Sequence, residues 1–532
     1  MCKTRPMDSN VAELLSRAAS QEPDKTILSE AATGRTVTCS GLEELVQRVV
    51  QGLDDAGMVA GYRVMIATGN RIEFVAAYLG ALRAGMVVVP VNPRSATGEL
   101  IRMLADSGTR MVVADGDTIT AVRAAVGGLS EAIEAAGYES TTRPRIVTVG
   151  TTLEPGERSW DQLVATLAGH SPRRVDPETL AVLLYTSGTS GRPRAAMLSH
   201  RALLANIEQV AEVMPQMITG RDVVLGVLPL FHVYGLNAVL GQVLRQQARL
   251  VLVDGFDPEG SLDLIEDEAI SVLPVAPPVF AYWMQLPGLE DRLGPVRLVL
   301  SGSAPLDPAL TEAFTKRTGV EIHQGYGLTE AAPVVTSTLC SENPTSRSVG
   351  AALPGIEIRL VDENGREPHD EDGGEIHIRG GNLFSGYWPD GADGPDDDGW
   401  WPTGDVGYLD PTGDLYLVDR VKELVIVSGF NVYPSEVEDV IAELPDVAEA
   451  AVIGVEDPET GEAVVAYVKP TAAGASDNLL DVVRRHTQDR LARFKQPSVI
   501  HVVDQLPYTP TGKVQKGRLR ATERRRALGL LE

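Results

Sequence analysis

A run of hydroxyl side chains and glycines near the middle of the chain could bind phosphate. The run consists of Thr186, Ser187, Gly188, Thr189, Ser190, Gly191 and, after two further residues, Arg194. Glycines let the backbone bend so that its N–H groups converge on an anion, and hydroxyls and a cation add contacts to phosphate oxygens. The GxxxxGK[ST] order of a Walker loop is absent, and Pro193 prevents a helix from starting at once. A plain Ser/Gly linker rarely lies between a buried strand and a helix capped at Ser199, so we interpret the run as a phosphate loop.

Lysine is rare in this chain, which makes its positions informative. Of the 47 Lys and Arg residues, only eight are Lys, and five of these lie from Lys422 onward. A lysine provides a flexible ammonium point charge, unlike the planar guanidinium of arginine. Lys513 follows a segment rich in Pro, Thr and Gly, which suits a mobile side chain that reaches into a cleft. Lys513 is therefore a candidate functional cation.

Polar, glycine-rich turns also follow other predicted strands. Ser301–Leu306 and Gln324–Glu330 are two such segments and are therefore candidate site segments. Asp405 lies in a Thr-Gly-Asp sequence that we predict to form a β-turn, where Asp is common.

The elements that must position these side chains show an α/β pattern over the first 330 residues. Val64–Ala67 is predicted as a buried strand, Arg71–Ala84 as a helix and Met86–Val91 as the next strand. Further strands are predicted at Leu180–Tyr185, Ser271–Val275, Arg297–Leu300 and Val320–His323. Ligands in such sheets bind outside the carboxyl ends of the strands, where the polar turns lie.

The residue pattern changes after about residue 347. Short alternating strands with many Gly, Pro and Asp residues predict a β-rich subdomain at about 347–418. A capping box at Ser435–Glu438 predicts a helix to about Leu444, followed by strands Ala448–Val455 and Glu462–Lys469 and a helix to about Arg493. We therefore predict an α/β and α+β multidomain protein. A large N-terminal domain of layered α/β subdomains spans 1–418, and a small mobile α+β C-terminal domain spans 419–532.

Composition restricts the class of protein. Of the 532 residues, 43% are hydrophobic, which is typical of a folded protein. The formal net charge of −26 argues against a nucleic-acid partner. The cysteines at 2, 39 and 340 lack metal-ligand spacing. No apolar run suits a signal peptide or a transmembrane segment, so we expect a cytoplasmic enzyme.

The phosphate loop resembles that of the adenylate-forming superfamily, which includes acyl- and aryl-CoA ligases, peptide adenylation domains and beetle luciferases. Six further segments are similar to family signatures and follow in the family's order. They are Leu228–Gly235, Ser301–Leu306, Gln324–Glu330, Thr403–Asp405, Asp419–Glu423 and Pro507–Lys513. The chain most resembles fatty acyl-CoA and 4-coumarate–CoA ligases.

The resemblance implies a nucleotide site in which Tyr326 stacks on adenine and Asp405 accepts hydrogen bonds from both ribose hydroxyls. It also implies that Thr329 contacts phosphate and that Glu330 binds Mg²⁺. The residues implied to bind the nucleotide are Thr186, Ser187, Gly188, Thr189, Ser190, Gly191, Arg194, Ser303, Ala304, Gln324, Gly325, Tyr326, Gly327, Asp405 and Arg420. Arg194 stands where the family usually has Lys, and it keeps the positive charge.

The catalytic residues implied by the resemblance are Lys513, Thr329, Glu330 and Lys422. Lys513 would contact the carboxylate and the α-phosphate, and Lys422 would be the hinge about which the small domain rotates. The acyl substrate would lie against His232, Tyr234, Gly302, Ala331, Pro333 and Val334. No Arg or Lys lies in these segments, so we expect a neutral, apolar acid.

We therefore expect an acid–thiol ligase that uses ATP, Mg²⁺ and CoA to activate a fatty or aryl acid. If the protein associates with itself, we expect a homodimer. Delivery of acyl-AMP to a carrier protein in trans stays open as an alternative. An oxidative, luciferase-like second step has no support in the sequence. A non-catalytic binder would most simply have lost Lys513, Asp405 or Glu330, and all three are present.

Overall fold

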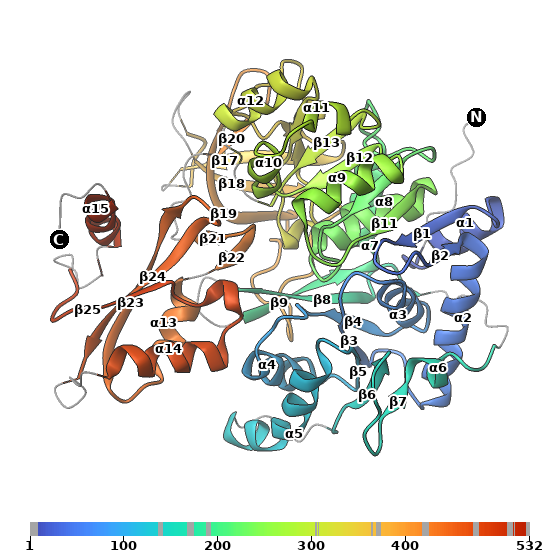
Figure 1. Cartoon of the computed structure of the whole chain (residues 1–532), viewed down its shortest axis with the longest axis horizontal. Helices are drawn as coiled ribbons and strands as arrows, with labels where there is room; N and C mark the ends of the chain where they lie inside the picture. The colour runs from blue at the N-terminus through green and yellow to red at the C-terminus, as the bar shows by residue number, and fades with distance from the viewer. Residues whose placement is uncertain are drawn as a thin grey trace. The chain divides into compact units, whose positions relative to one another are not determined.

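The structure is a computed structural model. It describes residues 9–136, 142–167, 175–187, 193–303, 306, 308–362, 365–368, 374–417, 425–432, 434–471, 478–507, 514 and 516–527 (Figure 1). The chain divides into two compact units. The first comprises Met1–Pro93, Leu104–Leu184 and Ala195–Asp419, and the second comprises Arg94–Met103, Tyr185–Arg194 and Arg420–Glu532.

One seven-stranded sheet has the order β7-β6-β5-β3-β4-β8-β9, and the pairs from β7 to β8 are parallel. Its strands are β3 (Arg63–Ala67), β4 (Val87–Pro90), β5 (Met111–Asp115), β6 (Arg145–Val149), β7 (Arg158–Ser159), β8 (Leu180–Ser187) and β9 (Pro193–Ser199). All five residues of β5 are buried, as expected for a strand with covered faces. The predicted strands at 64–67, 86–91 and 180–185 are confirmed.

A second seven-stranded sheet has the order β14-β13-β12-β10-β11-β1-β2, in which only β2 is antiparallel to its neighbour. Its strands are β1 (Thr26–Glu30), β2 (Thr36–Thr38), β10 (Val223–Gly226), β11 (Arg249–Leu252), β12 (Val272–Val275), β13 (Leu298–Ser301) and β14 (Ile322–Gln324). The three strands predicted between residues 271 and 323 are therefore confirmed as β12, β13 and β14.

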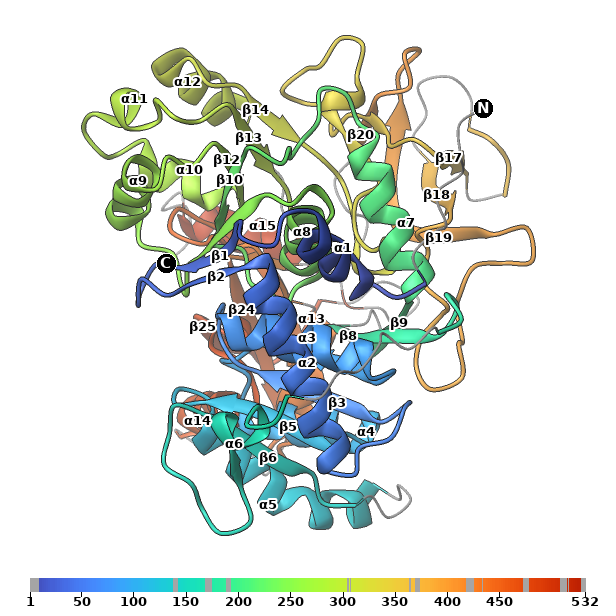
Figure 2. The same cartoon turned by 90° about the vertical axis from the view of Figure 1, so that its right-hand side faces the viewer.

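Helix α3 (Ile72–Arg83) contacts both large sheets, touching β1 of one and β3 and β4 of the other (Figure 2). All of its residues are buried. A Cβ at Gly80 would lie 2.5 Å from Val49 Cγ1, so glycine lets α2 (Cys39–Asp55) approach closely. The buried guanidinium of Arg83 forms an ion pair with Glu43, and the distance from Arg83 Nη1 to Glu43 Oε1 is 2.6 Å.

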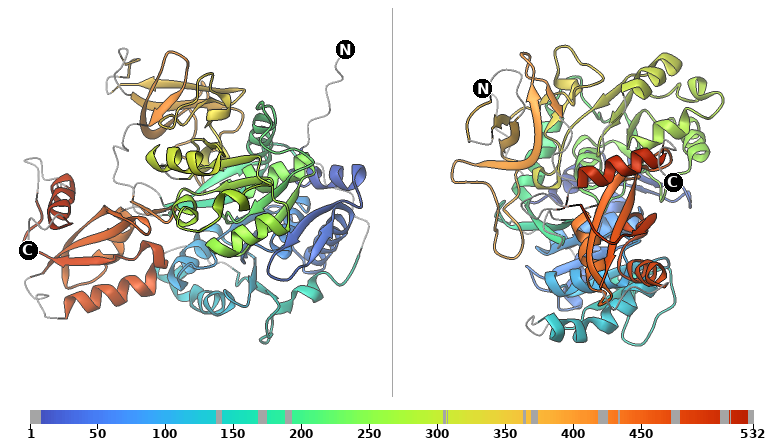
Figure 3. Two further views of the ribbon diagram at one scale, coloured as in Figure 1. Left: turned by 45° about the horizontal axis from the view of Figure 1, so that its top comes forward. Right: turned by 90° about the vertical axis from the view of Figure 1, so that its left-hand side faces the viewer.

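The predicted β-rich region contains a four-stranded antiparallel sheet of order β17-β18-β19-β20, which lies at the top of the left-hand view of Figure 3. Its strands are β17 (Ile356–Val361), β18 (Gly374–Gly380), β19 (Trp400–Leu409) and β20 (Leu415–Leu417). A two-stranded ribbon joins β15 (Thr336–Ser337) and β16 (Ala351–Ala352).

The second unit is built on the antiparallel pair β23 (Val447–Asp457) and β24 (Gly461–Pro470). The other strands of this sheet are β21 (Val425–Val427), β22 (Phe430–Val432) and β25 (Val499–Val502). Helices α13 (Pro434–Ala442) and α14 (Leu479–Arg490) supply Val437, Val440 and Val483 to the core over this sheet. The predicted mixed α/β and α+β architecture is thus confirmed.

The predicted capping box at Ser435–Glu438 is wrong. Helix α13 begins at Pro434, whose fixed φ suits the first helical position, so Ser435 lies inside the first turn. The acidic side chains are used elsewhere: Glu436 Oε1 accepts from Lys495 Nζ at 2.9 Å, and Glu438 Oε1 accepts from the Val452 N–H at 2.6 Å.

The remaining helices connect or flank the sheets. They are α1 (Glu13–Gln21), α4 (Thr97–Ser107), α5 (Ile119–Ala136), α6 (Trp160–Leu163), α7 (His200–Ala211), η1 (Tyr234–Gly241), α8 (Gln242–Gln246), α9 (Pro258–Asp267), α10 (Pro278–Trp283), α11 (Leu289–Arg292), α12 (Pro308–Thr318), η2 (Thr329–Ala331), η3 (Thr338–Cys340), η4 (Arg493–Lys495) and α15 (Lys516–Ala527). Ser199 caps α7 as predicted, since its side chain accepts from the Ala202 N–H. Within the described part of the chain, no helix is both long and apolar enough to cross a bilayer.

The buried His200 predicts acid sensitivity of the first unit. Burial lowers the pKa of His200 from its ordinary value of 6.5 to about 4. Between pH 7 and pH 5 the unfolded chain therefore binds a proton that the folded chain does not, and the free energy of unfolding falls by about 2 kcal/mol at this residue.

We expect His200→Gln to reduce the loss of stability between pH 7 and pH 5 by about 2 kcal/mol. Glutamine does not titrate in this range, and any loss of the bond that His200 Nδ1 accepts from the Val11 N–H at 3.2 Å lowers stability equally at both pH values. Urea unfolding at both pH values measures the effect, and an equal loss in parent and variant would contradict it.

Candidate active site

The loops after β13 and β14 lie side by side at the carboxyl ends of these parallel strands. Ser301 and Gln324 are register partners, and the Gly325 N–H donates to Ser301 O at 3.2 Å. Gln324 Nε2 donates to Ser346 O at 2.9 Å, which fixes its side chain. Gly302, Ser303, Gln324 and Gly325, all predicted from sequence, are therefore neighbours in one part of the fold.

Two glycines flank Tyr326 because another segment of backbone passes very close. A Cβ at Gly325 would lie 2.7 Å from Thr336 O, and a Cβ at Gly327 would lie 2.3 Å from Pro333 O. The Gly-Tyr-Gly sequence thus lets the segment 333–336 run directly against the loop. This packing leaves Tyr326 only 5% exposed.

Tyr326 and Asp405 are distant in sequence and in direct contact in the structure. The Tyr326 hydroxyl donates to Asp405 Oδ2 at 2.6 Å, and the Tyr326 N–H donates to Thr336 Oγ1 at 3.1 Å. The two residues predicted to contact adenine and ribose are therefore brought together. A flat aromatic ring beside a two-oxygen acceptor is a suitable arrangement for a nucleoside.

The prediction that Asp405 lies in a β-turn is wrong, because Asp405 is part of strand β19. The pairing of β18 with β19 shifts register between Glu375 and His377, so Thr403–Asp405 form a bulge in the strand. Thr403 Oγ1 holds the bulge by donating to Ile376 O at 2.8 Å and accepting from the Asp405 N–H at 3.1 Å. A bulge re-aims a side chain without ending the strand, which explains how Asp405 reaches Tyr326.

Glu330 lies with Thr329 in the short helix η2 and is 8% exposed. The Tyr387 hydroxyl donates to Glu330 Oε1 at 2.7 Å, and the Glu330 carbonyl accepts from the Phe384 N–H at 2.8 Å. The described residues contain no group of three His, Cys, Asp or Glu side chains that could hold a metal ion. Mg²⁺ is commonly held by one or two carboxylates together with substrate phosphates, so Glu330 fits that role.

Tyr387 was not predicted from the sequence, although a Gly-Tyr-Trp-Pro segment is an aromatic-rich signal that could have indicated it. Its ring packs edge-on against Phe384 with the ring centroids 5.0 Å apart. This packing and the hydroxyl contact orient the Glu330 carboxylate.

We expect Tyr387→Phe to raise the Mg²⁺ concentration for half-maximal activity about tenfold, because it removes the donor to Glu330 and keeps the ring. A Mg²⁺ titration of acid-dependent pyrophosphate release at saturating ATP measures this change. Tyr408→Phe, at a tyrosine that stacks on Tyr416, is the matched control. An unchanged titration in Tyr387→Phe would count against the proposed role of Tyr387.

His232 and Tyr234 lie where the Leu228–Gly235 loop enters the π-helical turn η1. Burial lowers the pKa of His232 to about 4 and raises the pKa of Tyr234, so both side chains are neutral near pH 7. The Tyr234 N–H donates to His232 Nδ1 at 3.4 Å. A Cβ at Gly302 would lie 3.1 Å from Tyr234 Cε1, so the Tyr234 ring lies against the loop after β13.

Three asparagines that the sequence analysis missed hold the segment Ala331–Val334. Asn206 pairs with the Val334 backbone, accepting from its N–H at 3.0 Å and donating to its carbonyl at 2.8 Å. Asn237 donates to Ala332 O at 2.6 Å, and Asn382 donates to Ala331 O at 2.7 Å. Because Asn237 belongs to η1, it ties this segment to the helix that begins with Tyr234.

Thr186 and Arg194 lie at the ends of β8 and β9 in the second unit, where Thr186 Oγ1 donates to Arg194 O at 3.4 Å. The backbone of Ser187 ends β8. The predicted site residues Gly188, Thr189, Ser190, Gly191, Ala304, Arg420, Lys422 and Lys513 lie outside the described residues.

Comparison with known proteins shows the family. A model of the AMP-binding enzymes matches residues 15–388, and a model of their C-terminal domain matches residues 436–513. The chain therefore belongs to the AMP-binding enzyme family and is an adenylate-forming enzyme of the CoA ligase type. ATP and CoA are the substrates that this family implies.

The chain is similar over nearly its whole length to proteins named 4-coumarate–CoA ligase. It is 34% identical to 4-coumarate–CoA ligase 5 of Oryza sativa subsp. japonica, covering 94% of this chain and 92% of the relative. It is 31% identical to 4-coumarate–CoA ligase of Pinus taeda, with the same coverage of both chains.

Solved structures show the same fold. The amide bond synthetase McbA of Marinactinospora thermotolerans matches with a TM-score of 0.82 and 27% identity, covering 96% of this chain and 99% of that one. ATP-bound MatB of Rhodopseudomonas palustris matches with a TM-score of 0.70 and 31% identity, covering 97% and 99%.

Proposed function

We propose that the chain is an acid–thiol ligase that converts a hydrophobic fatty or aryl acid into its CoA thioester in two steps. A carboxylate oxygen attacks the α-phosphorus of ATP, the bond to the β-phosphate oxygen breaks, and pyrophosphate leaves. The CoA thiolate then attacks the carbonyl carbon of acyl-AMP, and AMP leaves with the oxygen that joined it to the acyl group. The contact between Tyr326 and Asp405 is the observation that carries the proposal, because it brings together the residues of two family signatures that are proposed to bind adenine and ribose.

In the first step the residues of this chain bind and orient the nucleotide. Tyr326 is proposed to stack on adenine and Asp405 to accept the ribose hydroxyls, with Thr329 and the 186–194 loop on the phosphates. Mg²⁺ bound at Glu330 would neutralise phosphate charge. Lys513 is proposed to donate to both the carboxylate and the α-phosphate as charge develops between them.

In the second step the C-terminal domain is proposed to rotate about Lys422, so that Lys513 leaves and CoA reaches the adenylate. We propose a boundary between residues 418 and 419, with the β-rich subdomain at about 347–418 on the N-terminal side. A few residues that absorb a large change in φ and ψ are typical of such domain rotations.

An apolar, uncharged acyl group is supported by the proposed acyl site. Ala331 is fully buried, and His232 and Tyr234 are neutral near pH 7. Gly302, Pro333 and Val334 add no charge to this set. A second carboxylate on the substrate would find no cation among these residues and would be costly to bury.

The test is AMP release with Mg–ATP against short to long fatty acids, cinnamates and benzoates, each with and without CoA. Turnover that requires CoA and favours one class of acid would support the ligase and identify its substrate. If none of the acids gives AMP or pyrophosphate, the proposed substrate class is wrong.

The alternative acceptor is a carrier protein in trans. Pyrophosphate exchange with an acid and no stimulation of AMP release by CoA would favour it. Since one structural relative is an amide bond synthetase, the same assay should include an amine. We propose a cytoplasmic enzyme, and any self-association is proposed to give a homodimer.

A further inference from the structure

Asn70 lies in the loop after β3 and makes four hydrogen bonds with segments of the other large sheet. Its Nδ2 donates to Gly226 O at 3.0 Å, to Leu228 O at 2.9 Å and to Val253 O at 3.2 Å. Its Oδ1 accepts from the Leu230 N–H at 2.9 Å. One amide thus satisfies backbone groups at the ends of β10 and β11 and at the start of the loop that carries His232 and Tyr234.

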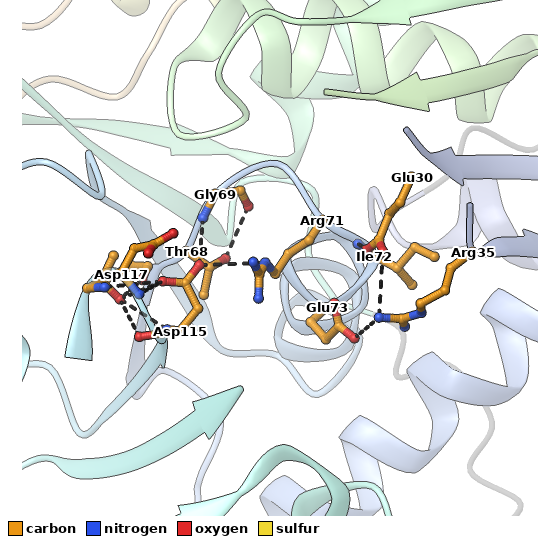
Figure 4. A network of polar contacts seen from close by, with 11 residues as sticks. Glu30, Arg35, Thr68, Gly69, Arg71, Ile72, Glu73, Asp115 and Asp117 are labelled. Carbon is orange, nitrogen blue, oxygen red and sulfur yellow. Dashed lines mark hydrogen bonds and ion pairs between the residues drawn. The ribbon is translucent and has the colours of Figure 1, made fainter. Parts of the chain in front are cut away.

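The backbone on both sides of Asn70 is held by a separate polar network (Figure 4). The Gly69 N–H donates to Asp115 Oδ2 at 3.1 Å, and the Ile72 N–H donates to Glu30 Oε1 at 2.8 Å. Arg71 Nε lies 3.5 Å from the same Asp115 oxygen, and Asp115 is 1% exposed. Anchors from β5 and β1 therefore fix the Asn70 backbone, so the side chain projects from a rigid support.

The bonds from Asn70 reach the acyl side of the proposed site through a short path. Asn70 contacts the residues before and after Pro229, and the Pro229 carbonyl accepts from the His232 N–H at 3.1 Å. A Cβ at Gly235 would lie 2.4 Å from the same carbonyl, so the first turn of η1 packs directly on this peptide. A shift of the Pro229 peptide would therefore move His232 and the start of η1, which includes Tyr234.

We propose that Asn70 is a positioning residue for the Leu228–Gly235 loop and so sets the binding of the acid. This role rests on the proposed function, in which His232 and Tyr234 lie against the acid. The amide of Asn70 offers two N–H donors, shared among the carbonyls of Gly226, Leu228 and Val253, and an oxygen that accepts from Leu230. Truncation would remove the acceptor of the Leu230 N–H and the donor to Leu228 O and Val253 O, while Gly226 O would keep its bond from the Val253 N–H. The loop could then shift, and small displacements of positioning groups have large effects on binding and rate.

Hydrogen–deuterium exchange without ligands tests whether the hydrogen bonds of Asn70 hold the Leu228–Gly235 loop. In Asn70→Ala, amides in 228–236 should exchange about tenfold faster than in the parent, because Leu230 loses its acceptor. Asn70→Asp keeps that acceptor but places a carboxylate against three carbonyls, so the same amides should also exchange faster in this variant. It replaces Asn70→Ala in the test if the alanine variant does not fold. Exchange equal to that of the parent would overturn the proposal.

Kinetics test the consequence for the acid. We expect the acid KM of Asn70→Ala to rise about tenfold while the ATP KM stays within twofold. The control is Asn10→Ala, at an asparagine that donates to Leu82 O at 2.8 Å and accepts from the Ala12 N–H at 2.9 Å. That variant should lower the melting temperature without changing either KM. If the amides of Asn70→Ala exchange faster but its acid KM is unchanged, Asn70 has no positioning role. If the parent enzyme is inactive on every acid, the proposed function alone is refuted.

Discussion

Lys513→Ala is expected to lower the rate of acyl-AMP formation about a thousandfold and to leave thioester formation from preformed acyl-AMP within severalfold of the parent rate. Negative charge accumulates between the attacking carboxylate and the α-phosphate, and a positioned cation is most effective there. In the proposed second step Lys513 has left the site, so its loss should not matter. This difference between half-reactions sets Lys513 apart from a residue that only supports the fold.

The two half-reactions are measured separately, as acid-dependent pyrophosphate release without CoA and as AMP release from added acyl-AMP with CoA. Lys469→Ala is a matched control, because Lys469 pairs with Glu449 at 2.6 Å within the second unit. The control should retain both rates. Equal losses in both half-reactions of Lys513→Ala would refute the proposed role.

Asp405→Ala is expected to raise the ATP Kd about a hundredfold. The variant removes two charge-assisted hydrogen bonds to the ribose hydroxyls, together worth about 3 kcal/mol, and it also frees the Tyr326 hydroxyl that donates to Asp405. The KM of the acid should change much less, because Asp405 is assigned to the nucleoside.

Two further variants separate the contributions of the pair. Tyr326→Phe removes the hydroxyl and keeps the ring, so it should weaken ATP binding less than Asp405→Ala. Asp410→Ala removes an acidic residue just past the end of β19 whose carboxylate accepts from the Thr412 and Asp414 N–H groups of its own turn, and should leave binding unchanged. Calorimetric titration with ATP measures all three, and parent-like binding by Asp405→Ala would show that ribose is held elsewhere.

The architecture was largely predictable because periodicity and turn residues mark it strongly. The strand, helix and strand predicted at 64–67, 71–84 and 86–91 correspond to β3, α3 and β4 with end shifts of about one residue. The predicted polar turns after β13 and β14 do lie together, since parallel strands bring their carboxyl ends to one edge.

What the sequence could not predict depends on contacts between distant segments. The bulge that places Asp405 inside β19 arises from its register with β18, which no local pattern encodes. The bonds of Asn70 and Tyr387 join residues 160 and 57 positions apart, so no local pattern predicts either partner, although the aromatic-rich segment around Tyr387 marks that residue as a candidate. The predicted cap at Ser435 failed because Pro434 already starts the helix.

The central claim, attack of the acid on the α-phosphate, is tested most directly with an acid whose carboxylate carries two ¹⁸O atoms. The enzyme is incubated with this acid, Mg–ATP and CoA, and the products are analysed by mass spectrometry. We predict that each AMP carries one ¹⁸O atom, that pyrophosphate carries none and that the thioester keeps the other. Unlabelled AMP, or label in pyrophosphate or inorganic phosphate, would contradict the proposed reaction.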